Sequence, residues 1–411
     1  MDSQSVCLPW GAWCEDAPAR LVFPADWDIS VCEMESKPPL DRKGIEKALD
    51  GPFGTRPIEE MGHGKKRVVI AVEDITRPSP FEKVLTPLVE RLERAGIRDY
   101  EITFLICNGS HAPMGRRELV LKLGESIVER FFATNHNPYD ALCDTGLRLG
   151  KIPFKVNRLF FEADLRIIAG SIIPHNFAGF SAGAKLVLPG LSDIETLERS
   201  HKFVMMGLRG GVNDVENNRF RSELEDAVTN LGIDLFIGAV PNKERDICGL
   251  FCGDTVETHR KGVLFAREVF QTTVPEKSDL LILNAYPKDM ELLQADTAFT
   301  ALKSIKRELV SDGGVILLTS RCQNGFGFHS LFGPGMRLYR KPVSRRFLKG
   351  RELVFYSPNL NKEEFKKIFW EGYSFFSDKT SLIEYLKERF KLSCRVTVLP
   401  YAPTQLLQCH T

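Results

Sequence analysis

Apolar runs alternate with amphipathic stretches along most of the chain. The runs 67–72 and 101–107 are dominated by aliphatic residues, which predicts buried strands, and the stretch 81–95 has the apolar spacing of a helix. Strands and helices in alternation are typical of a parallel sheet with crossover helices. The pattern predicts further strands at 165–169, 234–240, 246–251, 280–283, 314–318, 353–356 and 395–399, and further helices at 116–123, from 192 onward, 256–270, 290–309 and 381–390.

A polar, proline-containing segment at 272–278 interrupts this alternation, which restarts with the apolar run 280–283. A chain of 411 residues is long for a single core and suits two α/β domains. We therefore predict an N-terminal domain over residues 1–271 and a C-terminal α/β domain over residues 279–411. The expected fold class is α/β, with two Rossmann-like domains, mostly parallel sheets and an active-site cleft between them.

The composition is that of a soluble globular protein, with 27% charged residues and a formal net charge of +1. This balance argues against a nucleic-acid platform and against an anionic membrane surface, so neither partner is expected. No apolar run approaches membrane-spanning length, and the N-terminus lacks the pattern of a secretory signal, so we expect a cytoplasmic protein. The closest cysteines, Cys248 and Cys252, lack zinc-knuckle spacing and are interpreted as buried thiols.

Three polar loops each follow a predicted strand. Because the carboxyl ends of parallel strands line the ligand crevice of an open α/β sheet, these loops are expected to share one edge. An arginine there favours anion recognition, and a lysine among small residues can meet a phosphate, a carboxylate or a carbon electrophile. The polar side chains concerned are Asp74, Thr76, Arg77, His111, His175 and Lys185.

Each of these features also has a structural interpretation. Asp74 and Thr76 could form a turn before a proline, and Arg77 could be a surface residue. His111 alone could be a hydrogen-bonded polar side chain, and the segment around Lys185 a tight turn with a solvated lysine. The convergence of three loops on one sheet edge favours the functional interpretation.

His201 lies on the helix predicted to begin near residue 192. Ile194, Leu197 and His201 fall three or four residues apart and so share one helical face. A histidine there is either a core residue bonded to backbone or a ligand directed into a cleft. There is no His-Glu-x-x-His motif and no second helical histidine beside it, so a metal at His201 would be held mostly by another group. A Gly-x-Gly-x-x-Gly fingerprint for a nicotinamide dinucleotide is also absent after an early strand.

The loops resemble those of the nickel-pincer lactate racemase family. The run 74–80, Asp-Ile-Thr-Arg-Pro-Ser-Pro, is similar to the family's Asp-x-Thr-Arg-Pro-x-Pro loop, and 109–113 is similar to its Gly-x-His-x-Pro loop. The segment 175–190, with His201 downstream, is similar to the family's long signature segment. The run 284–294 resembles part of the family's second domain, so the likeness spans most of the chain.

The resemblance implies a racemase or epimerase that inverts the Cα of a 2-hydroxycarboxylate. Its cofactor would be a nickel-pincer nucleotide, a pyridinium mononucleotide whose two thiocarbonyl-type groups grip nickel, bound by the N-terminal domain while the C-terminal domain closes the cleft. In the family the lysine matching Lys185 can be joined to the cofactor through a thioamide, and the histidine matching His201 ligates nickel. Those matching His111 and His175 act as acid and base, and the arginine matching Arg77 stabilises the polar end of the substrate.

By the same resemblance, Asp74 and Thr76 belong to the cofactor site and Gln294 to the substrate site, and cofactor-synthesis proteins are implied partners. Imidazole cannot remove the Cα proton of a hydroxycarboxylate unaided, so hydride transfer to the cofactor, with a histidine taking the hydroxyl proton, is the expected chemistry. Leu293 and Thr297 stand where the family's lactate racemase has a tyrosine and a lysine. A longer or differently functionalised 2-hydroxy acid is therefore expected in place of lactate.

Three nearby charged residues are candidates to compensate for the missing lysine: Asp296, Lys303 and Arg321. Two other functions stay open at this point. One is a nicotinamide-dependent 2-hydroxyacid oxidoreductase, against which the missing dinucleotide fingerprint counts. The other is a non-catalytic cofactor-binding homologue, against which the complete set of histidines and lysine counts.

Overall fold

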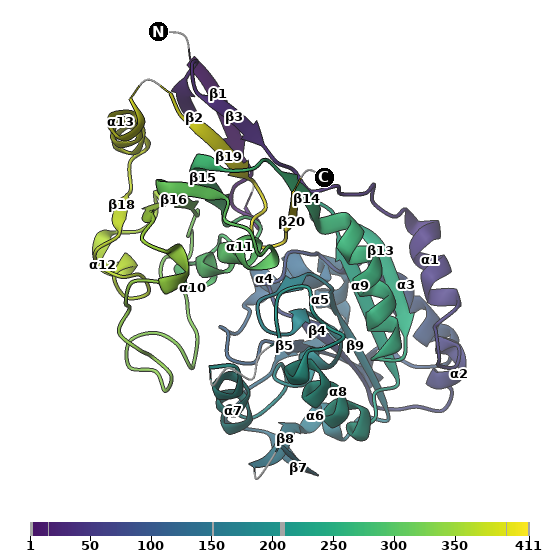
Figure 1. Ribbon diagram of the computed structural model, residues 1–411. Helices are drawn as coiled ribbons and strands as arrows, with labels where there is room; N and C mark the ends of the chain where they lie inside the picture. Colours follow the sequence, from purple (N-terminus) through teal and green to yellow (C-terminus); the bar gives the residue numbers. More distant parts are fainter. Residues whose placement is uncertain (1–2, 15, 150–151, 206–209, 392, 410–411) are drawn as a thin grey trace. The chain divides into compact units, whose positions relative to one another are not determined.

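The computed structural model describes residues 3–14, 16–149, 152–205, 210–391 and 393–409 (Figure 1). The chain forms two compact units, one made of Ser36–Val269 and the other of Met1–Glu35 together with Phe270–Thr411. Each unit contains a six-stranded sheet, and most strand pairs in the two sheets are parallel. The predicted α/β class with mostly parallel sheets is confirmed.

The sheet of the 36–269 unit has β4 and β9 at its centre. In sheet order its strands are β13 (Ile247–Gly253), β12 (Leu235–Pro241), β9 (Leu165–Ser171), β4 (Val68–Glu73), β5 (Ile102–Cys107) and β6 (Phe132–Asn135). All pairs are parallel except β12 with β13, which is antiparallel. Every residue of β4 is buried, as expected for a strand covered on both faces.

Helices and short hairpins surround this sheet. The helices are α1 (Arg42–Asp50), α2 (Ile58–Gly62), α3 (Glu82–Arg94), α4 (Arg116–Leu123), α5 (Glu125–Arg130), α6 (Arg158–Phe161), α7 (Ile194–Met205), α8 (Arg219–Leu231) and α9 (Glu257–Phe270). The hairpins are β7 (Leu142–Leu149) with β8 (Ile152–Asn157), and β10 (Pro174–His175) with β11 (Gly179–Phe180). A 3-10 turn, η2, covers Gly183–Leu186. Cys248 and Cys252 are buried free thiols, as predicted.

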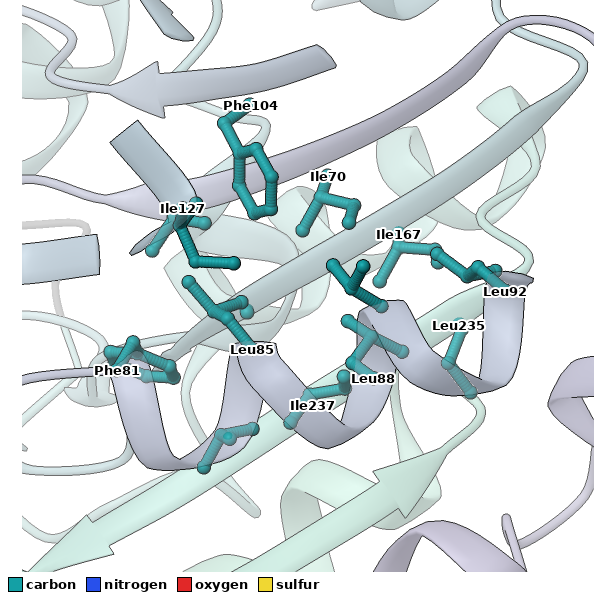
Figure 2. Close-up of a cluster of buried hydrophobic side chains, with 14 of the residues drawn as sticks. Ile70, Phe81, Leu85, Leu88, Leu92, Phe104, Ile127, Ile167, Leu235 and Ile237 are labelled. Carbon is teal, nitrogen blue, oxygen red and sulfur yellow. The ribbon is translucent and has the colours of Figure 1, made fainter. Parts of the chain in front are cut away.

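Helix α3 shows how the apolar spacing builds the core. Leu85, Leu88 and Leu92 recur every three or four residues, so they lie on one helical face. Figure 2 shows this face against Ile70 and Phe104 of the sheet, and all five side chains are buried. The predicted helix 81–95 is confirmed, and its apolar face packs in the same buried cluster as β4.

The second unit is built on an entirely parallel sheet. In sheet order its strands are β18 (Ser374–Phe376), β17 (Glu352–Tyr356), β16 (Val310–Thr319), β15 (Ser278–Asn284), β19 (Arg395–Leu399) and β3 (Asp28–Val31). Leu280 and Ile282 face one buried cluster and Leu281 and Leu283 another, so β15 is covered on both faces. The remaining elements are β1 (Ser3–Leu8), β2 (Ala19–Pro24), β14 (Gln271–Val274), β20 (Leu406–Cys409), α10 (Leu292–Ala295), η3 (Asp296–Phe299), α11 (Thr300–Ser304), η4 (Arg346–Leu348), α12 (Lys362–Phe365) and α13 (Lys379–Phe390).

The N-terminal segment of the chain belongs to this second unit. Strand β3 pairs with β19, and Asn284 donates a hydrogen bond to the carbonyl of Pro9, so the first 35 residues pack with the C-terminal half. The predicted N-terminal domain, 1–271, includes these residues, whereas the structure groups them with residues 270–411. The segment 272–278, predicted as the domain boundary, contains part of β14 and the first residue of β15.

The predicted helix 290–309 is wrong in length. Three short pieces, α10, η3 and α11, replace it and end at Ser304. The Thr297 hydroxyl donates to the carbonyl of Gln294 and the Ser304 hydroxyl to that of Ala301, at 2.7 Å each. Side-chain hydroxyls that donate hydrogen bonds to backbone carbonyls compete with the hydrogen bonds of a regular helix, which explains the interruption. Within the described ranges, no helix is both long enough and apolar enough to span a membrane.

Candidate active site

The three predicted loops meet at the carboxyl ends of β4, β5 and β9, on one edge of the sheet of the 36–269 unit (Figure 1). They line a cavity of about 120 Å³ that opens to solvent. Six of the predicted residues line this cavity: Asp74, Arg77, His111, His175, Lys185 and His201.

The first loop surrounds the Asp74 carboxylate with donors. His111 Nδ1 lies 2.6 Å from Asp74 Oδ2, and the backbone N–H and hydroxyl of Thr76 donate to Oδ1 at 2.9 and 2.5 Å. Arg77 Nη1 donates to the Thr76 hydroxyl at 2.9 Å. Burial by itself would raise the pKa of Asp74, but the charge and hydrogen bond of His111, with Arg77 and Thr76, hold that pKa well below its usual range. The turn that the sequence offered as an alternative is present, and it also orients the site.

This arrangement fixes the hydrogen of His111. A carboxylate oxygen only accepts hydrogen bonds, so Nδ1 of His111 carries the hydrogen that points to Asp74. In the neutral ring, Nε2 then has the lone pair. The His111 side chain is 19% exposed and lines the cavity, so its ring can act as a base toward a ligand there.

His175 has the opposite arrangement. Its Nδ1 accepts hydrogen bonds from the backbone N–H groups of Phe177 and Ala178, each at 3.2 Å. Because backbone N–H groups only donate, Nδ1 is unprotonated and, in the neutral ring, Nε2 carries the hydrogen. The two histidines on the cavity wall therefore differ in protonation at Nε2.

Lys185 lies in η2, on the segment between β11 and α7. Burial lowers the pKa of its amine to about 7, and the positive charges of Arg77 and Arg221 add to this effect. Two buried side chains stabilise the backbone just before η2. Arg221 donates to the carbonyl of Ala182 at 3.1 Å, and the His259 ring lies 2.8 Å from the carbonyl of Ser181. A lysine that is partly neutral near pH 7 is a competent nucleophile.

His201 combines both interpretations that the sequence left open. Its Nδ1 donates to the carbonyl of Leu197 at 2.8 Å, as a core histidine does, yet the ring also lines the cavity. Burial lowers its pKa to about 4, helped by Lys185 and His111 and opposed by the Leu197 hydrogen bond. The neutral ring has its lone pair on Nε2, the form that binds metals. No group of three or more His, Cys, Asp or Glu able to hold a metal occurs among the described residues, so a metal at His201 would need ligands from a bound group.

The remaining predicted residues do not line this cavity. Thr76 contacts Asp74 and His111 without lining the cavity. Gln294 is in α10 of the other unit and is 9% exposed. Of the candidates to compensate for Thr297, Asp296 pairs with Arg345 and Arg321 pairs with Asp16, each at 2.5 Å.

Sequence reasoning missed several buried polar groups in and around the cavity. Glu73, Lys122, Arg221 and His259 are all buried in the 36–269 unit. Glu73 carried a signal, because it ends an otherwise apolar strand directly before Asp74. Lys122 carried none, since a lysine in the last turn of a short helix is usually solvated.

Comparison with known proteins identifies relatives of this chain. Residues 15–210 match the family described as the lactate racemase N-terminal domain. A lactate racemase from Lactiplantibacillus plantarum is 30% identical over 301 residues, which span 71% of this chain and 69% of that protein. One from Thermoanaerobacterium thermosaccharolyticum is 29% identical over 292 residues, or 69% of this chain and 66% of that protein.

Solved structures share the fold. The lactate racemase apoprotein from Thermoanaerobacterium thermosaccharolyticum superposes with a TM-score of 0.77 at 22% identity, over 98% of this chain and all of that one. A protein from Thermotoga maritima gives 0.69 at 18% identity, over 91% of this chain and all of that one. Fold and relatives together define an α/β isomerase, a racemase. The chain belongs to the lactate racemase family.

Proposed function

We propose that this protein racemises or epimerises a 2-hydroxycarboxylate, inverting its Cα. The observation that carries the proposal is the pair of histidines that line the cavity with opposite hydrogen placement. A racemase needs a base for one enantiomer and an acid for its mirror image. His111 Nε2 can accept the hydroxyl proton, and the Nε2–H of His175 can return one.

The neighbouring residues define how each histidine works. When His111 takes up a proton, the buried Asp74 carboxylate at 2.6 Å stabilises the imidazolium that forms. Arg77 lines the cavity beside them and would bind the polar end of the substrate. Because Thr76 accepts a hydrogen bond from the Arg77 guanidinium, the arginine is oriented before the substrate arrives.

The residues present fit a nickel-pincer nucleotide. Lys185, whose amine has a pKa near 7, would hold it through a thioamide, and His201 would ligate nickel, with Asp74 and Thr76 in the same site. When bound, this group would supply the hydride acceptor and donor for Cα. A single imidazole suffices if sulfur and carbon of the nucleotide provide the other ligands.

The substrate proposed is a 2-hydroxy acid other than lactate. The hydroxyl of Thr297 is bonded to the carbonyl of Gln294, and Leu293 is apolar, so neither offers the cation or the phenol expected for lactate. Asp296 and Arg321 are already in ion pairs. We propose Gln294 as a substrate-binding residue, because its amide can bond a hydroxyl or carboxylate oxygen.

The test is a racemisation screen on protein produced together with a pathway that synthesises the cofactor. Single enantiomers of a panel of 2-hydroxy acids are incubated with the protein and separated by chiral chromatography. We expect at least one acid to converge on a mixture of both enantiomers. A protein that carries nickel and the cofactor mass, yet inverts none of the acids, would instead be a non-catalytic member of the family.

A further inference from the structure

A buried ion pair at the cavity is not part of the proposed chemistry: Glu73 lines the cavity, and its partner Lys122 does not. Lys122 of α4 and Glu73 at the end of β4 are 0% and 3% exposed, and Lys122 Nζ lies 2.7 Å from Glu73 Oε1. The Lys122 ammonium also sits 5.2 Å from the centre of the Phe81 ring. Replacing such a pair by apolar residues of similar volume is often neutral for stability. We therefore look for the role of this pair in the backbone segments to which it is hydrogen-bonded.

Lys122 closes the loop that carries Arg77. Its ammonium has three N–H donors, and besides Glu73 it donates to the carbonyl of Arg77 at 3.2 Å and to that of Ser79 at 2.8 Å. Both carbonyls belong to the loop after β4. A single buried cation thus fixes the backbone on either side of Pro78.

Glu73 extends the same network to the segment that carries Lys185. Its two oxygens accept from the backbone N–H of Ser171 at 2.6 Å and from the Ser171 hydroxyl at 2.5 Å. The carbonyl of Ser171 in turn accepts from the hydroxyl of Ser181 at 2.5 Å, four residues before Lys185. The Ser171 hydroxyl also bonds that of Ser79 at 2.8 Å, which closes the network.

We propose that Glu73 and Lys122 are positioning residues that set Arg77 and Lys185 relative to each other. This inference rests on the proposed function, in which Arg77 binds substrate and Lys185 holds the cofactor. Reacting groups must be placed within a fraction of an ångström, so a support that joins two loops of the site affects turnover through the positions of Arg77 and Lys185.

The experiment compares Lys122→Met, Glu73→Gln and the double variant with the unmodified holoenzyme. Each single change leaves a charged partner buried and should lower thermal stability, whereas the double variant removes both charges and should recover much of it. Arg91→Met is the matched control, because Arg91 is also a largely buried cation, paired with Asp50 and Glu59 away from the cavity.

We expect the double variant to keep a kcat about 10- to 100-fold below that of the unmodified enzyme even where stability is restored, because the bonds to the Arg77 and Ser79 carbonyls are still missing. Arg91→Met should lose stability without this loss of kcat. A purely structural role predicts the reverse for the double variant, namely that kcat returns together with stability. That result would overturn the proposal.

Hydrogen exchange supplies a readout that needs no substrate. Peptides covering 74–81 and 171–183 should exchange amide hydrogens faster in the double variant and stay unchanged in Arg91→Met. Unchanged exchange in both peptides of the double variant would contradict the positioning role. If the unmodified holoenzyme inverts no 2-hydroxy acid, the proposed function fails, and the exchange result still decides whether the pair holds the loops.

Discussion

Asp74 and His111 form a short, nearly buried contact, with Asp74 Oδ2 2.6 Å from His111 Nδ1 and Asp74 only 4% exposed. The two residues come from loops after different strands, β4 and β5, which run in parallel and end at the same edge. A carboxylate in this position orients the ring. It therefore decides which nitrogen of His111 faces the cavity.

Replacing Asp74 by asparagine should lower kcat by about 100-fold or more, because the amide can donate to Nδ1 and move the ring hydrogen to Nε2. The measurement is the initial racemisation rate at saturating substrate. Asp164→Asn is a suitable control, since that carboxylate pairs with Arg67 on the surface of the same unit. Equal losses in the two variants would argue against an orienting role for Asp74.

The same substitution should change how stability depends on pH. The pKa of Asp74 is lower in the folded chain than in the unfolded one, so its ionised form stabilises the fold. That contribution is complete above about pH 4, the ordinary pKa of an aspartate, and is lost as the pH falls through the lowered value. Denaturation of Asp74→Asn and the unmodified protein at pH 7 and pH 3 should show a smaller difference at pH 3.

Lys185 should react with amine-selective reagents at lower pH than other lysines. Its pKa is about 7, against an ordinary value of about 10.4, so half of the amine is neutral near pH 7. Competitive acetylation of cofactor-free protein, followed by mass spectrometry, gives the midpoint. A midpoint near that of the surface residue Lys341 would contradict the lowered pKa.

The lowered pKa of Lys185 also determines how the stability of the fold changes with pH. The unfolded chain binds more protons than the folded chain between about pH 7 and about pH 10.4, so this group makes stability rise with pH in that window. Lys185→Met should consequently be stabilised most at the lower end of the window. The variant should also lack any covalent cofactor mass.

His201→Gln should reduce the nickel content of protein made with the cofactor pathway, because Nε2 of His201 is the proposed metal ligand. His136→Gln is the matched control. His136 is also buried, its Nε2 lies 2.8 Å from the carbonyl of Ser192, and burial lowers its pKa to about 4, but it does not line the cavity. Metal analysis that finds full nickel in His201→Gln would remove this residue as a ligand.

Replacing either His111 or His175 by asparagine should lower racemisation by about 100- to 10,000-fold in both directions, the usual size of a lost acid or base. Both directions fall together because the same two groups serve each enantiomer in turn. Nickel content and covalent mass should stay unchanged. A variant that loses activity together with its nickel would indicate a role in holding the cofactor.

The sequence by itself determined the elements that build the sheets and the loops that carry the chemistry. Helix α4 and strand β19 occupy the predicted residues. Strands β4 and β5 end where the polar loops were expected to begin, and β9 runs two residues beyond the predicted strand 165–169. These features follow from local patterns, since an apolar run favours burial and a polar residue at its end marks the strand terminus. The family motifs added the identity of the histidines and of Lys185.

Tertiary structure alone decided which distant segments meet and which charges are buried. The pairing of β3 with β19 assigns the first 35 residues to the C-terminal half, and no local pattern encodes a contact of that range. Lys122 has the sequence context of a solvated lysine, and only its position under the loops makes it a buried partner of Glu73. The placement of hydrogens on His111 and His175 likewise depends on the groups that folding brings to each ring. The side chain itself can carry its hydrogen on either nitrogen, so the sequence alone does not select one.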